Sequence, residues 1–362
     1  LMSYKDRHGE RVVEQTGYRE LYEVLTYMSK QPFYCGEDQK ARYNSMMQGD
    51  LESLSPIYQE FKEKQQEFLD NNEKQSHWSR GKQTSEAEPS AVPEADVEKR
   101  NFHYNLWEVP KGGAKTRYQW NVDAIHTLKQ IEAEGRLAAP EEQTILSRYV
   151  GWGGLSQAFD DNNAIWKKEY DELKSLLSEE EYTAARATVN NAFYTAPEVA
   201  SCISQALVQF GFRGGNVLEP SMGIGNFFGT LPTPLQRCNL YGVELDSISG
   251  RIAEQLYQRA NISITEFEKT TYPDNFFDAV IGNVPFGDYK IFDPRYNKYN
   301  FRIHDYFIAK ALDQVRPGGI VAVITTKGTL DKSNPTIRKY LAERAELVGA
   351  VRLPNTAFKE SA

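Results

Sequence analysis

The chain of 362 residues exceeds the size of an ordinary single domain, so we expect an α/β catalytic domain together with a helical extension. Its formal net charge of −8 at pH 7 excludes a protein that is basic overall, and any contact with nucleic acid has to come from a local patch. The three cysteines are far apart and no Cys or His pair has ligand spacing, which disfavours a disulfide framework and a zinc site, so we expect no metal.

Residues 1–78 are predicted to form a helical N-terminal region. Apolar and aromatic side chains recur every three to four residues over Glu14–Lys30 and Ser55–Asn71, which is typical of amphipathic helices. Residues 79–100 offer little to bury and predict a polar linker. The opening residues lack the apolar core of a signal peptide, and no apolar run approaches the ~20 residues of a membrane span, so we expect a cytoplasmic protein.

Residues 101–190 are predicted to be a helical segment that packs on the catalytic domain, with helices over Asn121–Ala133 and Pro140–Tyr149. Ser178 and Glu181 have the spacing of a capping box, which predicts the start of a further helix.

A glycine-rich turn follows the second of these helices, where Trp152 stands among Gly151, Gly153 and Gly154. Two interpretations stay open for this tryptophan. It is either a core residue at a tight turn or a platform on which a ligand binds.

Short β-rich runs alternate with helical stretches in residues 191–362, which predicts a doubly wound parallel sheet with a Rossmann-like α/β fold. Six runs share the apolar, β-branched composition of strands: Asn216–Leu218, Leu240–Val243, Ile262–Ile264, Ala279–Ile281, Ile320–Thr325 and Leu347–Val351. Ligands of such sheets bind at the carboxyl ends of the strands.

A glycine turn of sequence Glu-Pro-Ser-Met-Gly-Ile-Gly-Asn-Phe follows the first of these strands. Gly223 and Gly225 allow positive φ and a close approach of backbone N–H groups to a ligand. Glu244 ends the next strand about 20 residues downstream, where a carboxylate accepts the hydroxyls of a ribose. A dinucleotide site is the alternative, but its third glycine is replaced by Phe228.

The segment Phe193-Tyr194-Thr195-Ala196-Pro197-Glu198 precedes the glycine turn. We expect a helix to begin here, with Thr195 as the N-cap and Glu198 closing a capping box.

The sequence Asn283-Val284-Pro285-Phe286 follows the apolar strand that ends at Gly282. Methylation of an aryl amine is slow because the nitrogen lone pair is delocalised into the ring. If this run binds such an amine, acceptors at the Asn283 side chain and the Val284 carbonyl would favour the pyramidal form, and Phe286 would stack on a base that has left the duplex. The alternative is an ordinary turn at the end of a strand with a buried phenylalanine.

Aromatic and cationic residues alternate after this segment, an arrangement that suits stacking on bases together with phosphate contacts. The residues predicted to contact nucleic acid are Tyr289, Lys290, Arg295, Tyr296, Lys298 and Arg302. We expect His304 to pack or to cap the next helix rather than to act in acid–base chemistry.

The glycine turn and the Asn-Val-Pro-Phe run together resemble the signature of class I S-adenosylmethionine-dependent adenine-N6 DNA methyltransferases. That family carries Asn-Pro-Pro-Tyr/Phe, and Val284 departs from it by keeping the carbonyl while releasing the φ restraint of proline. The motif order resembles the gamma arrangement. The resemblance implies S-adenosylmethionine as cofactor and DNA as partner, with cofactor contacts from Phe193, Tyr194, Thr195, Glu219, Pro220, Gly223, Gly225, Phe227, Glu244, Glu266 and Phe267.

Residues from Tyr118 onward also resemble the methylase portion of large methylase–helicase proteins of conjugative or phage-like elements. Sheets of this class end with a helix, a sixth strand and an antiparallel seventh strand, for which we expect a helix over Pro335–Arg344 and the sixth strand over Leu347–Val351. Only 11 residues then remain, so the resemblance implies that the last strand is missing and that a target-recognition or helicase region follows in the full-length protein.

Two functional alternatives stay open. One is a protein or RNA amine methyltransferase, and the other is a catalytically degenerate DNA-binding or anti-restriction module.

Overall fold

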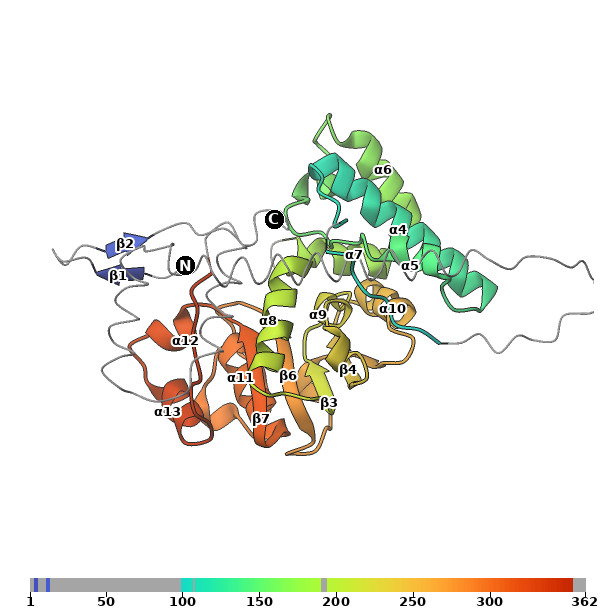
Figure 1. Ribbon diagram of the computed structural model, residues 1–362. Coiled ribbons are helices and arrows are strands. Elements are labelled where there is room, and N and C mark those ends of the chain that lie inside the picture. Colours follow the sequence, from blue (N-terminus) through green and yellow to red (C-terminus); the bar gives the residue numbers. More distant parts are fainter. Residues whose placement is uncertain (1–2, 6–10, 14–98, 107, 190–193, 354–362) are drawn as a thin grey trace, which may run out of the picture. The chain divides into compact units, whose positions relative to one another are not determined.

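The computed structural model of the chain describes residues 3–5, 11–13, 99–106, 108–189 and 194–353 (Figure 1). The predicted helices Glu14–Lys30 and Ser55–Asn71 lie outside the described residues, as does nearly all of the predicted linker. In the described part of the chain we find no helix with the length and hydropathy that a membrane crossing requires.

The chain divides into two compact units, Ser3–Glu98 and a second unit that holds Lys99–Ala362. In the first unit, strands β1 (Ser3–Lys5) and β2 (Arg11–Val13) pair in antiparallel fashion. The second unit contains both the helical segment and the sheet, so the subdivision at residue 190 stays a prediction.

Four helices build the helical segment: α4 (Ala114–Glu134), α5 (Pro140–Leu146), α6 (Lys167–Leu176) and α7 (Glu179–Thr188). The predictions for α4 and α5 are confirmed, although α4 begins seven residues before its predicted start. The capping box is also confirmed, because the Glu181 N–H donates to the Ser178 hydroxyl at 3.1 Å. The largely polar helix α6 escaped prediction, since a single residue of it, Leu173, is buried.

A five-stranded parallel sheet forms the centre of the second unit and confirms the predicted α/β fold. Its spatial order is β5-β4-β3-β6-β7, with bounds of Asn261–Ile264, Asn239–Glu244, Asn216–Glu219, Phe277–Asn283 and Val315–Ile324. The chain runs outward from β3 through β4 to β5 and then returns to β6 on the other side of β3. This reversal is a topological switch point, where open sheets of this kind form a crevice for ligands.

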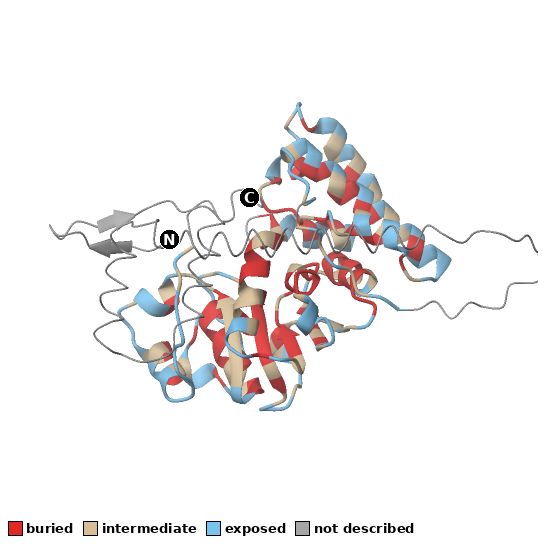
Figure 2. Ribbon diagram, in the orientation of Figure 1, coloured by how far each residue is buried: buried red, intermediate tan, exposed pale blue. Residues whose placement is uncertain are grey.

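Helices cover both faces of the sheet (Figure 1). The helices that follow the helical segment are α8 (Pro197–Gln209), α9 (Asn226–Gly229), α10 (Ser247–Leu256), α11 (Ile303–Gln314), α12 (Gly328–Asp331) and α13 (Thr336–Ala342). Both α8 and α11 pack on β6 and β7. Figure 2 shows the buried residues concentrated along the strands and along the helix sides that face them.

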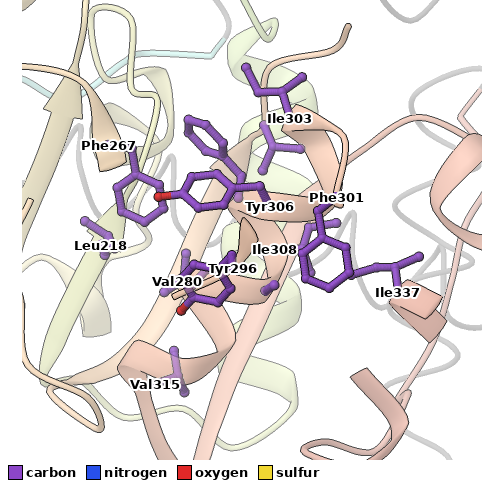
Figure 3. Packing of buried hydrophobic residues seen from close by; sticks show 14 of the residues in the cluster. Leu218, Phe267, Val280, Tyr296, Phe301, Ile303, Tyr306, Ile308, Val315 and Ile337 are labelled. Atoms are coloured by element: carbon purple, nitrogen blue, oxygen red, sulfur yellow. The ribbon is translucent and has the colours of Figure 1, made fainter. Parts of the chain in front are cut away.

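A core cluster of buried hydrophobic residues lies between the sheet and α11. Figure 3 shows Val280 of β6 packed near Tyr306 of α11 and Tyr296 of the preceding loop. Val280 belongs to this cluster while its neighbours Ala279 and Ile281 are buried elsewhere, because side chains alternate between the two faces of a strand.

The predicted strand over Leu347–Val351 is wrong. The described residues from Ala345 to Leu353 form no regular structure, and Leu347 is 73% exposed. An apolar run becomes a strand only where a neighbour supplies hydrogen-bond partners, and among the described strands β7 pairs with β6 alone. The helix predicted just before it is confirmed as α13.

Candidate active site

A cavity of about 430 Å³ opens at the carboxyl ends of β3, β4 and β6. Its wall combines the glycine turn after β3, the ends of β4 and β6, the segment after β5 and the start of α11 with residues of the helical segment. The switch point of the sheet therefore coincides with a cavity that the predicted motifs surround.

The glycine turn is held by Glu244. The Gly223 N–H donates to Glu244 Oε2 at 2.7 Å, and the Asp246 N–H donates to Glu244 Oε1 at 2.8 Å. Gly223 has a φ of 55°, and a Cβ atom added to it would lie 2.9 Å from the Tyr194 ring. Only glycine fits this position without strain, so Glu244 and Tyr194 together fix the backbone that faces the cavity.

Carboxylates dominate the charge around the cavity. Five of them line it, namely Glu219, Glu244, Asp246, Glu266 and Glu268, whereas no Lys, Arg or His is found among the described lining residues. Burial, together with the nearby charge of Glu244, raises the pKa of Glu219 well above its usual range. Burial likewise raises the pKa of Glu244 to about 7. The cavity thus favours a cationic ligand.

Glu219 also carries an oxygen, Oε2, that is buried without a hydrogen-bond partner. Thr195 Oγ1 is a second buried polar atom without a partner at this cavity. Buried polar groups are normally paired, so such atoms mark positions where a ligand supplies the missing partner.

Thr195 does not cap helix α8 as predicted. Ala196 occupies the N-cap position and Pro197 is the first helical residue, which places Thr195 one residue outside the helix. Its backbone carbonyl instead accepts a hydrogen bond from Asn226 Nδ2 at 2.7 Å. Proline is favoured at the first helical position, and this preference decides where the helix starts.

Tyr194 is oriented by a short chain of hydroxyl contacts. Its hydroxyl lies 2.5 Å from Ser249 Oγ, and the Ser249 hydroxyl donates to the carboxylate of Asp246. Asp246 also caps α10 by accepting from the Ser249 N–H at 2.8 Å. The beginning of α10 thereby holds the aromatic ring that packs on the glycine turn.

Asn283 ends β6 and presents its amide to the cavity. Its Oδ1 atom is buried without a partner, while its backbone carbonyl accepts a hydrogen bond from the Ser221 hydroxyl at 2.8 Å. Gly282, just before it, has a φ of 148°, a conformation that side chains rarely adopt. The backbone conformation of Gly282 and the hydrogen bond from Ser221 therefore place Asn283 Oδ1, an acceptor without a partner, in the wall of the cavity.

The three residues after Asn283 also line the cavity. The Val284 N–H donates to the Ile324 carbonyl of β7 at 3.1 Å, which anchors the segment to the sheet. Phe286 remains 41% exposed, so its ring is available at the mouth of the cavity. The alternative interpretation, an ordinary turn with a buried phenylalanine, does not match this exposed ring.

The predicted cofactor residues gather at this one place. Tyr194, Thr195, Glu219, Pro220, Gly223, Phe227, Glu244, Glu266 and Phe267 line the cavity. Gly225 lies behind the wall with a φ of 84°, where an added Cβ would meet Tyr257. Phe193 lies outside the described residues.

The predicted nucleic-acid residues divide into two groups. Tyr289 is half exposed and lines the cavity, and Lys290, Lys298 and Arg302 are exposed nearby in sequence. Tyr296 is buried, and its hydroxyl donates to Asp313 at 2.9 Å, so it is a core residue rather than a stacking face.

Arg295 is exposed but engaged in ion pairs. Its guanidinium binds Asp274 at 2.6 Å and Asp313 at 3.0 Å, so both carboxylates compete with any phosphate. Since a phosphate contact here requires breaking these pairs, the structure favours a packing role for Arg295.

The helical segment contributes residues that sequence reasoning did not assign to the site. Tyr149, Gly151, Trp152 and Thr188 line the cavity. Trp152 is 1% exposed and packs edge-on against Phe159, with ring centroids 5.3 Å apart, so it is a core residue whose position also borders the cavity. The glycine-rich turn around Trp152 was the only signal in the sequence.

The sequence profile of the N-6 DNA Methylase family matches residues 176–362, which is more than half of the chain. The chain belongs to the N-6 DNA methylase family. The matched residues include the glycine turn, Glu244 and the Asn283–Phe286 segment, whereas Tyr149, Gly151 and Trp152 of the cavity wall lie outside the match.

Two curated proteins are similar in sequence to this chain. The N-6 DNA methylase chain is 28% identical over 250 residues to the "Defense against restriction protein B" of Escherichia phage P1, an alignment that covers 67% of this chain and 10% of that protein. It is 24% identical over 206 residues to the "Type I restriction enzyme MjaIX methylase subunit" of Methanocaldococcus jannaschii, covering 49% of this chain and 36% of that protein. The chain thus spans only a minor part of the length of either relative.

Solved structures similar to the chain include a putative S-adenosyl-L-methionine-dependent methyltransferase from Methanococcus maripaludis. The two chains are 15% identical with a TM-score of 0.26, and the comparison covers 51% of this chain and 70% of that one. A phosphoethanolamine N-methyltransferase 2 from Haemonchus contortus in complex with S-adenosyl-L-methionine shares 18% identity at a TM-score of 0.29, covering 48% of this chain and 40% of that one.

The residues around the cavity fit the S-adenosylmethionine on which this family depends. The cofactor carries a sulfonium and an ammonium, and the wall offers carboxylates with one unpaired buried oxygen at Glu219. Glu244 stands at the carboxyl end of β4, the strand beside β3, where a ribose diol is expected. Gly223 leaves room for the close approach of a ligand to the turn.

Proposed function

We propose that the chain transfers the methyl group of S-adenosylmethionine to the exocyclic N6 amine of adenine in DNA. The observation that carries this proposal is the buried, unpaired Oδ1 of Asn283 beside an acid-lined cavity. An acceptor without a partner at this place suits a donor such as an aryl amine.

Asn283 Oδ1 and the Val284 carbonyl accept the two amine hydrogens in this mechanism. They draw the nitrogen toward a pyramidal geometry in which its lone pair is free to attack. The sulfonium of the cofactor supplies an electrophilic methyl group. When bound, the cofactor would give this methyl group to the amine nitrogen and leave as S-adenosylhomocysteine, and the amine would lose one proton to water.

Adenine reaches these acceptors only after leaving the double helix, since a stacked base is shielded by its neighbours. Phe286, at the mouth of the cavity, provides a face for the extruded ring. Tyr289 adds a half-exposed aromatic ring, and Lys290 and Arg302 are the cations placed best for phosphates.

The exposed cations Lys290 and Arg302 are paired more weakly than Arg295 is, so a phosphate competes for them more easily. Arg302 faces one exposed carboxylate, Asp288, at 3.1 Å, and Lys290 donates to the neutral Asn300 side chain at 2.6 Å. Exposed pairs of this kind contribute little, so a phosphate exchanges for them readily.

The test is mass spectrometry of nucleosides from DNA incubated with the protein and S-adenosylmethionine labelled in its methyl group. We expect labelled N6-methyl-2′-deoxyadenosine from duplex or single-stranded DNA. The variant Asn283→Ala should give no labelled nucleoside. Cofactor binding without label in any nucleoside would refute the proposed activity.

The anti-restriction name of the phage P1 relative supports a second candidate, a DNA-binding module whose pocket no longer catalyses. Parallel incubations with RNA and with protein test the alternative that the chain methylates an amine in one of those substrates.

The proposal also includes a gamma-like motif order and a helicase or target-recognition region in a longer protein. The small share of each relative that the chain spans supports this part of the proposal.

A further inference from the structure

Lys310 is a buried cation that the mechanism above does not use. It lies in the second half of α11 and is 6% exposed. A buried ammonium has lost its hydration and requires several strong acceptors in return. Burial accordingly lowers the pKa of Lys310.

The acceptors of Lys310 come from one short segment. Its Nζ donates to the backbone carbonyls of Phe267 at 2.7 Å, Glu268 at 3.2 Å and Thr270 at 3.4 Å. The same Nζ lies 4.8 Å from the centroid of the Phe267 ring, within the range of a cation–π contact. Asp293, with its Oδ2 3.9 Å away, supplies the nearest negative charge.

This segment forms one wall of the cavity. Glu266, Phe267 and Glu268 all line it, and they belong to a single 3-10 turn, η4 (Phe267–Lys269), and the residue before it. The turn follows β5, the edge strand of the sheet, so few backbone bonds from the sheet hold it in place.

Helix α11 replaces that missing support. Figure 3 shows Phe267 beside Tyr306 of α11, and their ring centroids are 6.4 Å apart. Phe307 packs on the same ring at 4.9 Å. Ring packing limits the position of Phe267, and the three hydrogen bonds of Lys310 hold the backbone of the turn directly to the helix.

We infer that Lys310 is a positioning residue that holds the Glu266–Glu268 segment so that the cavity selects a cofactor whose purine bears an amino group. This inference rests on the proposed function. Carboxylates accept hydrogen bonds and cannot donate them when ionised, so Glu268 suits the amine of adenine and opposes the carbonyl oxygen of hypoxanthine. Glu266 Oε1 is paired with the exposed Lys269 ammonium at 2.8 Å, and an exposed pair of this kind exchanges readily for a ligand amine. Such discrimination requires the acceptors to stay in place, which is the task assigned to Lys310.

The test compares the affinities of S-adenosylhomocysteine and S-inosylhomocysteine by calorimetry. The variants are K310M, which removes the donors, and K310Q, which keeps a shorter donor and remains informative if K310M does not fold. The control is I308V, a core change on the same helix whose side chain does not line the cavity. Hydrogen exchange at the amides of residues 267–270 is measured in parallel.

We expect the parent protein to prefer the adenine ligand by roughly 10- to 100-fold, as sites with a dedicated hydrogen bond do. K310M should lower this preference by about fivefold or more and speed exchange in the turn, since a lost charge-assisted bond is worth about that factor. K310Q should fall between K310M and the parent, and I308V should lower thermal stability without changing the preference.

The outcomes separate the two hypotheses. If the parent binds neither ligand, the proposed function fails. If the parent binds both equally, the purine role of the segment is overturned while the cofactor site stands. If K310M and K310Q keep the parental preference and exchange rates, Lys310 is not a positioning residue, although the proposed function is unaffected.

Discussion

Cofactor affinity should fall as the pH drops from 8 to 6, because an ionised Glu244 accepts hydrogen bonds from a ribose more strongly than a protonated Glu244 does. Burial raises the pKa of Glu244 from its ordinary 4.5 to about 7. The carboxylate already holds the N–H groups of Gly223 and Asp246, and both bonds favour its charged form. The ligand adds a further preference for that form, and it adds a positive charge.

The magnitude follows from the fraction ionised. With a pKa of about 7, roughly one carboxylate in eleven is ionised at pH 6 and nearly all at pH 8, so affinity should change about tenfold, or about 1.4 kcal/mol. The sign for the ligand-free protein is opposite. A raised pKa favours the protonated carboxyl in the folded state, so this contribution to the free energy of unfolding is present below pH 4.5 and is lost as the pH rises to about 7.

Two tyrosines that face Glu244 do not titrate in this window. Burial raises the pKa values of Tyr149 and Tyr194 well above their ordinary range, so both remain neutral between pH 6 and 8. Glu219 is the group that competes for the assignment, since burial and the charge of Glu244 raise its pKa as well.

Calorimetric titration of S-adenosylhomocysteine at several pH values measures the effect, with Glu244→Gln as the matched variant. Gln keeps the shape but loses the charge and one of the two N–H acceptors, so affinity should fall by about 1–3 kcal/mol and become independent of pH. An unchanged affinity in the parent between pH 6 and 8 would refute the reasoning. A full tenfold effect that persists in Glu244→Gln would assign the titration to Glu219 instead.

Three further predictions concern single residues. Asn283→Ala should keep cofactor affinity in calorimetry but lower the methylation rate by about a hundredfold or more, and an unchanged rate would remove its assigned role. Phe286→Ala should raise the KM for an oligonucleotide by roughly tenfold, whereas Phe286→Trp should stay near the parent in the same assay. Gly151→Ala should lower stability in thermal melts by about 1 kcal/mol or more, because Gly151 has a φ of 70° and a Cβ there would lie 3.2 Å from Tyr194; an unaltered melt would show that the turn relaxes.

The sequence was enough to predict the helices and strands whose local residue pattern determines their conformation. Five of the six expected strands are present, because apolar β-branched runs between helices are typical of a parallel sheet. The gathering of Glu219, Glu244 and Asn283 at one edge followed from the rule that the carboxyl ends of parallel strands face the same way.

Long-range contacts explain what could not be predicted. The burial of Tyr296 depends on Asp313, 17 residues away on α11, and nothing in the local alternation of aromatic and cationic residues reveals it. The participation of Trp152 in the cavity wall depends on how the helical segment packs beside the glycine turn. The strand expected over Leu347–Val351 failed because composition cannot show whether a neighbouring strand is present.

The one departure from the family pattern, Val284, is explained by the contacts that it makes. Proline at this position restrains φ through its ring but has no N–H to donate. Valine lacks the ring, yet its N–H bonds to the Ile324 carbonyl at 3.1 Å, and its side chain is 1% exposed within the core cluster under α11. A β-branched side chain is stiff, and Pro285 after it favours an extended backbone. The hydrogen bond to β7, the buried side chain and the following proline therefore restrain the segment in place of the missing ring, and they would hold the Val284 carbonyl in the acceptor position that we propose for it.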